Sequence, residues 1–152
     1  NFEAPDAIAG VATGAIAQGA LVADSLGLPY VYVRSTPKDH GLENLIEGNL
    51  KPGQKVVVIE DLISTGGSSL KAVEAIRAAG CEVVGMAAIF TYGFPVAVKR
   101  FTEAGVKLFT LSNYNSMLEA ALETDYIKPD DLETLKQWRK DPASWSPAPK
   151  AD

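Results

Sequence analysis

The sequence has little cysteine, no excess of positive charge and no long apolar run. Its single cysteine, Cys81, leaves no partner for an internal disulfide. The formal charge of -5 gives no general attraction to nucleic acid or to an anionic membrane. Uninterrupted apolar runs such as Val56 to Ile59 are far too short to cross a bilayer. These absences favour a cytoplasmic protein with neither a nucleic-acid nor a membrane partner.

What remains is the composition of one ordinary globular domain. Hydrophobic residues make up 47% and charged residues 22% of the 152 positions. Pro142, Pro147 and Pro149 fall close together at the end of the chain. We therefore expect a core domain over residues 1–140 and a loosely ordered tail over residues 141–152.

Short apolar runs alternate with segments of helical period along most of the chain. This alternation predicts an α/β fold with a mostly parallel central sheet flanked by helices. The expected strands are Ala7–Val11, Tyr30–Val33, Lys55–Ile59, Glu82–Phe90 and Lys107–Leu111. The expected helices are Ala15–Leu26, Ser68–Ala79, Pro95–Ala104, Ser116–Glu123 and Asp130–Lys140.

One segment, Ser35 to Pro52, interrupts the alternation. It is polar and contains several glycines, and a long segment of this kind inside a compact domain is usually functional or disordered. The apolar pair Leu45-Ile46 permits a small hairpin within it. We predict a long, flexible lid loop.

The sequence from Val56 to Ser69 carries the strongest chemical signal. A buried strand leads to the acidic pair Glu60-Asp61, which we expect at its carboxyl end, where open α/β sheets bind their ligands. The turn that follows feeds directly into a helix, so backbone N–H groups, hydroxyls and the positive helix end form a site for one phosphate. Its residues are Ser64, Thr65, Gly66, Gly67 and Ser68.

A purely structural interpretation of this pattern is also available. The two glycines then make an ordinary turn, Ser68 caps the helix, and Glu60 and Asp61 are solvated residues at a strand end. The pattern is not a P-loop, because no lysine follows the glycines, and it lacks the three-glycine spacing of dinucleotide sites.

The whole fourteen-residue pattern resembles the phosphoribosyl pyrophosphate (PRPP) signature of the type I phosphoribosyltransferases. Further segments resemble the orotate phosphoribosyltransferases within that family. These segments are Tyr32-Val33-Arg34, Pro37-Lys38-Asp39-His40-Gly41, Ile89-Phe90-Thr91-Tyr92 and Leu111-Ser112-Asn113-Tyr114. The resemblance implies a Mg²⁺-dependent transfer from PRPP to orotate, giving orotidine 5′-phosphate and pyrophosphate in pyrimidine (UMP) biosynthesis.

The resemblance also implies roles for individual residues. Glu60 and Asp61 are expected to bind the ribose hydroxyls, and Ser64, Thr65, Gly66, Gly67 and Ser68 the 5′-phosphate. Backbone amides of Thr13, Gly14 and Ala15 are expected to bind the pyrophosphate. Arg34, Lys38 and His40 are expected to contact the same group. Lys38, His40 and Asp61 would then be catalytic, with Mg²⁺ held mainly by PRPP near the acidic pair.

In the family the lid crosses a dimer interface, so the resemblance implies a homodimer in which each lid acts at its partner's site.

Taken without the resemblance, His40 is a solvated side chain, Arg34 a surface ion-pair partner and Thr13-Gly14 a simple turn with an N-cap.

The sequence departs from the family pattern at three places. Ser35-Thr36-Pro37 stands where many members have a further lid lysine, and Gly14 where some have a lysine. The family segment that supplies most orotate contacts lies upstream of the position of Asn1, so we expect PRPP binding to outlast orotate binding. Two alternatives stay open: a regulatory protein that binds PRPP or a nucleotide, which usually has a basic face, and a catalytically incompetent core.

Overall fold

The computed structural model describes residues 2–34 and 45–145 and shows an α/β fold built on a six-stranded sheet. The strand order is β3-β2-β1-β4-β5-β6, and every neighbouring pair is parallel except β2 with β3. The strands are β1 (Ala7–Val11), β2 (Tyr30–Val33), β3 (Ile46–Glu47), β4 (Lys55–Ile63), β5 (Glu82–Thr91) and β6 (Leu108–Asn113). The predicted fold class is confirmed.

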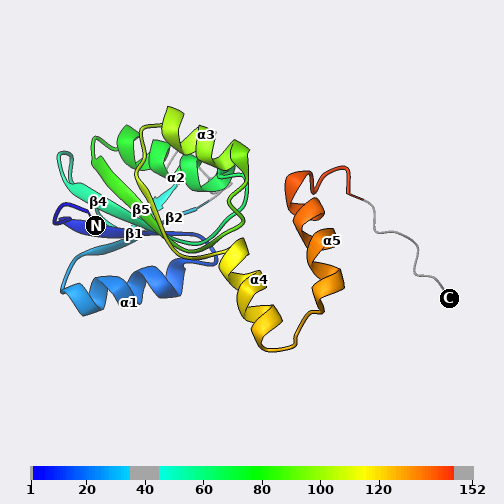
Figure 1. Ribbon diagram of the computed structural model, residues 1–152. Coiled ribbons are helices and arrows are strands. Elements are labelled where there is room, and N and C mark those ends of the chain that lie inside the picture. The colour runs from blue at the N-terminus through cyan, green and yellow to red at the C-terminus, as the bar shows by residue number, and fades with distance from the viewer. Residues whose placement is uncertain (1, 35–44, 146–152) are drawn as a thin grey trace.

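Helices cover both faces of the sheet, as Figure 1 shows: α1 lies on one face, and α2 and α3 lie on the other. The helices are α1 (Ile16–Leu26), α2 (Gly67–Ala78), α3 (Pro95–Glu103), α4 (Tyr114–Glu123) and α5 (Pro129–Lys140). Within the described ranges no helix has the length and apolar character needed to cross a membrane.

Alternate side chains of β4 belong to two different buried clusters of the core. Val56 and Val58 belong to the larger buried cluster, which includes Ile76 of α2. Val57 and Ile59 belong to a smaller cluster that includes Ala23 of α1. Alternate side chains point to opposite faces of a strand, so a continuous apolar run is what a strand covered on both sides requires.

The prediction for the end of β4 was wrong. The strand continues past Ile59, because Leu62 and Ile63 pair with Phe90 and Thr91 of β5 and the Ile63 side chain is fully buried. Glu60 and Asp61 therefore lie inside the strand. Within the segment proposed as a lid, β3 pairs antiparallel with β2 and residues 35–44 lie outside the described residues.

An aromatic cluster joins α5 to the end of the sheet. The Trp138 ring centroid lies 5.4 Å from that of Tyr92 and 5.4 Å from that of Tyr114, and Tyr92 stacks on Phe94 at 5.3 Å. These contacts hold α5 against the turn after β5, and the helix ends at Lys140 as predicted. Of the predicted tail, residues 146–152 lie outside the described residues.

The backbones of α1 and β1 approach closely at Gly10 and Gly19. A Cβ at Gly19 would lie 3.1 Å from the Gly10 Cα, and one at Gly10 would lie 2.7 Å from the Ala15 carbonyl oxygen. The Tyr30 hydroxyl, from β2, donates to the Ile16 carbonyl at 2.7 Å and so connects β2 to the start of α1. This packing fixes where α1 begins and therefore where the turn after β1 lies.

Replacing Gly10 should consequently destabilise the fold. We expect Gly10→Ala to lower the free energy of unfolding by about 1–3 kcal/mol, the usual effect of overpacking, in urea denaturation. Gly67→Ala is the control, because a Cβ there meets only Arg100 Nη1 at 3.7 Å. Wild-type stability in Gly10→Ala would show that α1 can shift without loss.

Candidate active site

A cavity of about 350 Å³ brings together three segments that are distant in sequence. Its lining contains Thr13 and Gly14 from the turn after β1, Glu60 and Asp61 from β4, and the turn from Ser64 to Ser68 with Ser69. The peptide bond between Ala12 and Thr13 is cis. Most of the residues singled out in the sequence thus meet at one site.

The turn after β4 is held by its neighbours and leaves the start of α2 open. Arg100 Nη1 donates to the Thr65 carbonyl at 3.0 Å. Gly66 has a φ of 79°, and a Cβ there would lie 2.8 Å from Phe101. Gly66 is the N-cap residue and no side chain caps α2, so Ser68 is not the cap. The first-turn N–H groups, which have no partner within a helix, therefore lie at the cavity.

Glu60 is buried at the junction of β4 and α2, with 4% of its surface exposed. Its Oε2 accepts from the Ser69 hydroxyl at 2.8 Å, and its Oε1 accepts from the Asp61 backbone N–H at 3.0 Å. Burial raises its pKa from 4.5 to about 7, and a side-chain hydrogen bond with Asp61 adds to the rise, although the Ser69 and Asp61 backbone donors oppose it. The Glu60 carboxyl therefore titrates near neutral pH, well above the ordinary range of an exposed carboxyl.

Asp61 lies between the strand and the turn after β1. Its Oδ1 accepts from the Leu62 backbone N–H at 2.7 Å. A Cβ at Gly14 would overlap the Asp61 carboxylate, so the missing side chain at Gly14 gives this carboxylate its place. A lysine at this position, as in some family members, would require the Asp61 side chain to move.

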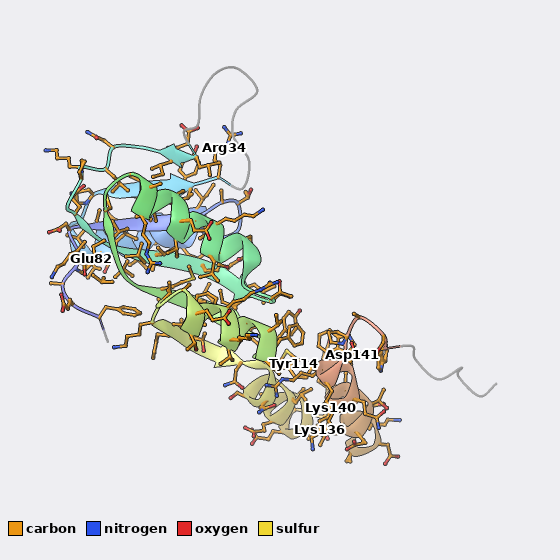
Figure 2. The ribbon with its side chains drawn as sticks, turned by 90° about the horizontal axis from the view of Figure 1, so that it is seen from above. Arg34, Glu82, Tyr114, Lys136, Lys140 and Asp141 are labelled. Atoms are coloured by element: carbon orange, nitrogen blue, oxygen red, sulfur yellow. The ribbon has the colours of Figure 1, made fainter. Side chains whose placement is uncertain are left out.

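Ala15 and Arg34, the other predicted site residues in the described part of the chain, do not line this cavity. Ala15 is fully buried where α1 begins. Arg34, labelled in Figure 2, follows β2. Its Nη1 lies 3.5 Å from Glu47 Oε1, so the ion pair that the sequence also allowed is present. Lys38 and His40 lie outside the described residues.

Sequence reasoning missed Ser69 and Arg100. Ser69 is 1% exposed and shares the buried face of α2 with Ala72, Val73 and Ile76. A serine at the first position of an apolar i, i+3, i+4, i+7 stripe is a signal that would have found it. No comparable signal marks Arg100, which reaches Thr65 from another element.

The raised pKa of Glu60 has a measurable consequence for stability. Glu60 has a pKa of about 7 in the fold and 4.5 in the unfolded chain, so the folded state binds the proton more tightly. The free energy of unfolding therefore falls as pH rises between those values, by roughly 3 kcal/mol at most. Glu60→Gln removes this loss, so its stability relative to wild type should increase from pH 5 to pH 7 and then level off. Urea denaturation across this range tests the prediction.

The control is Glu74→Gln, at an exposed position of α2, which should keep the wild-type pH dependence. A stability difference between Glu60→Gln and wild type that stays constant with pH would contradict the assignment.

Comparisons with known proteins agree with this site. The model of the phosphoribosyl transferase domain matches residues 1–115. An orotate phosphoribosyltransferase of Phocaeicola vulgatus is 72% identical over 145 residues, which cover 95% of this chain and 68% of the relative. The structure of orotate phosphoribosyltransferase from Aeropyrum pernix has a TM-score of 0.71 and 31% identity, over 82% of this chain and 67% of that one.

A third similar protein is the orotate phosphoribosyltransferase of Mycobacterium tuberculosis H37Rv, solved in complex with PRPP. It has a TM-score of 0.62 and 29% identity, over 74% of this chain and 64% of that one. The family match extends over every segment that lines the cavity, from the turn after β1 to the start of α2. The chain belongs to the phosphoribosyl transferase family and, within it, to the orotate phosphoribosyltransferases.

Proposed function

We propose that this chain transfers the phosphoribosyl group of PRPP to orotate, forming orotidine 5′-phosphate and releasing pyrophosphate. One observation carries the proposal: a helix N-terminus, a carboxyl pair and a backbone turn line one cavity of about 350 Å³. These three parts correspond to the phosphate, the ribose diol and the pyrophosphate of PRPP.

The 5′-phosphate and the ribose bind at neighbouring parts of the cavity. The 5′-phosphate binds the N–H groups and hydroxyls from Ser64 to Ser68, where the α2 dipole favours negative charge. Asp61 accepts hydrogen bonds from the ribose hydroxyls. Glu60, predicted from the sequence to bind the ribose as well, accepts with its two oxygens from the Ser69 hydroxyl and the Asp61 backbone N–H, and in this proposal it positions those residues.

The pyrophosphate binds the backbone amides of Thr13 and Gly14, which line the cavity. Ala15 does not take part as predicted, because it is fully buried and its N–H donates to the Val11 carbonyl at 3.1 Å. Cleavage of the C1′–oxygen bond builds positive charge on the ribose and negative charge on pyrophosphate. Groups aimed at these charges stabilise the transition state more than the ground state. In this proposal Asp61 faces the ribose, while Arg34, Lys38 and His40 supply positive charge for the leaving group.

The residues at the cavity fit a Mg²⁺ ion that is bound mainly by substrate. Among the described residues no three His, Cys, Asp or Glu side chains gather into a metal site, and Mg²⁺ typically takes one or two carboxylates with substrate phosphates. Asp61, with Glu60 beside it, would hold the ion, which when bound would supply positive charge to the pyrophosphate group.

For orotate we propose the aromatic wall beside the phosphate turn. A second cavity, of about 730 Å³, is lined by Ser64 and Thr65 on one side and by Tyr92, Phe94 and Trp138 on the other. A planar base packs well on aromatic rings. Ser64 and Thr65 line both cavities, so this wall adjoins the PRPP cavity.

Placing a negative charge in the phosphate turn should prevent PRPP binding without damage to the fold. Gly67 leads α2, and an acidic residue in a first helical turn is compatible with the helix dipole. We expect Gly67→Asp to bind PRPP at least about tenfold more weakly than the uncharged, similarly shaped Gly67→Asn, by calorimetry with Mg²⁺. Equal affinities of the two variants would remove the 5′-phosphate from this turn.

We also propose a homodimer in which each lid serves the partner's site, as the resemblance implies. Asp61→Asn and Lys38→Ala chains should then be inactive alone, whereas a hybrid dimer contains one site with both wild-type residues. Co-expressed chains with different tags allow hybrid dimers to be isolated and assayed for orotidine 5′-phosphate. Inactive hybrids of confirmed composition would show that Lys38 acts within its own chain.

A further inference from the structure

A separate cavity of about 410 Å³ lies between α4, α5 and the turn after β5. One face of α5 contributes Lys136, Arg139 and Lys140, which are spaced three and four residues apart. Tyr114 and Asn115 from the start of α4 form the opposite wall, and Gly93 closes it. Figure 2 shows Lys136 and Lys140 along α5, beside Tyr114.

The charge at this cavity is one-sided. Its lining contains three cations and no carboxylate, in a protein whose formal charge is -5. Arg139 and Lys140 in the last turn of α5 complement the helix dipole, but Lys136 lies before that turn. Like charges four residues apart destabilise a helix, so the pairing of Lys136 with Lys140 on one face does not stabilise α5.

Arg139 is held rigidly where it borders the cavity. Its Nη1 donates to Asn115 Oδ1 at 2.7 Å, and its Nε and Nη2 donate to the carbonyls of Tyr92 at 2.8 Å and Gly93 at 3.2 Å. A guanidinium has five N–H donors, so these three bonds leave two for a ligand. Neither Lys136 nor Lys140 forms an ion pair with a residue in the described part of the chain.

We propose that this cavity is a second anion site, which binds a phosphate group, either free or as a phosphate monoester. A fixed guanidinium and two lysines on adjacent turns supply the donors that a phosphate dianion requires. The site is distinct from the turn at α2, and its existence does not depend on phosphoribosyl transfer. Because Arg139 also holds the carbonyls of Tyr92 and Gly93, a bound anion perturbs the turn that borders the aromatic cavity.

The test uses a chain in which Gly67→Asp repels phosphate from the turn at α2. Inorganic phosphate and ribose 5-phosphate are titrated separately while NMR follows the Arg139 Nε–H and Gly93 N–H signals. Both signals should shift and saturate. Adding Lys136→Gln and Lys140→Gln should weaken binding by about tenfold. The matched control, Lys51→Gln with Lys99→Gln, removes two exposed charges elsewhere and should leave the affinity unchanged.

The result also identifies the form of the ligand. Tighter binding of ribose 5-phosphate than of phosphate would indicate a monoester, and equal binding would indicate the phosphate group alone. Shifts that do not saturate, or that persist unchanged in the Lys136→Gln, Lys140→Gln chain while circular dichroism shows an intact fold, would overturn the proposal. The cations would then serve only the end of α5.

Discussion

The burial of Glu60 against Ser69 is the interaction around which the site is organised. It connects β4 to the first turn of α2, the helix whose N-terminus lies at the phosphate turn. It also places Asp61, the next residue, against Gly14 of the turn after β1. A carboxyl kept in this position has a pKa of about 7, so near neutral pH the site retains a group that would be more stable in water.

The sequence predicted those features that depend on neighbouring residues. β1 and β2 have the predicted bounds, because each is a short apolar run ended by polar or turn-forming residues. β4 was predicted too short, because the acidic pair ends its apolar run while its hydrogen-bond ladder with β5 continues to Ile63. Only the packing of α2 on the sheet shows that Glu60 is buried.

The same distinction applies to the site as a whole. The phosphate turn and the acidic pair lie within ten residues of the chain, so a continuous motif was enough to find them. The aromatic wall takes Trp138 from α5 and Tyr92 from the turn after β5, forty-six positions away in sequence, and no local pattern connects them. The contacts of Arg139 with Tyr92, Gly93 and Asn115 likewise required the folded chain.

The close approach of α1 and β1 constrains how this protein is able to change. Two missing side chains, at Gly10 and Gly19, bring the backbones together and set the position of the turn that reaches Asp61. Because only hydrogen atoms stand at those positions, no substitution there is small enough to adjust the turn gradually. On this packing, substitutions on the solvent-facing side of α1, where Leu21 and Leu26 are exposed, disturb the turn less than any substitution at Gly19.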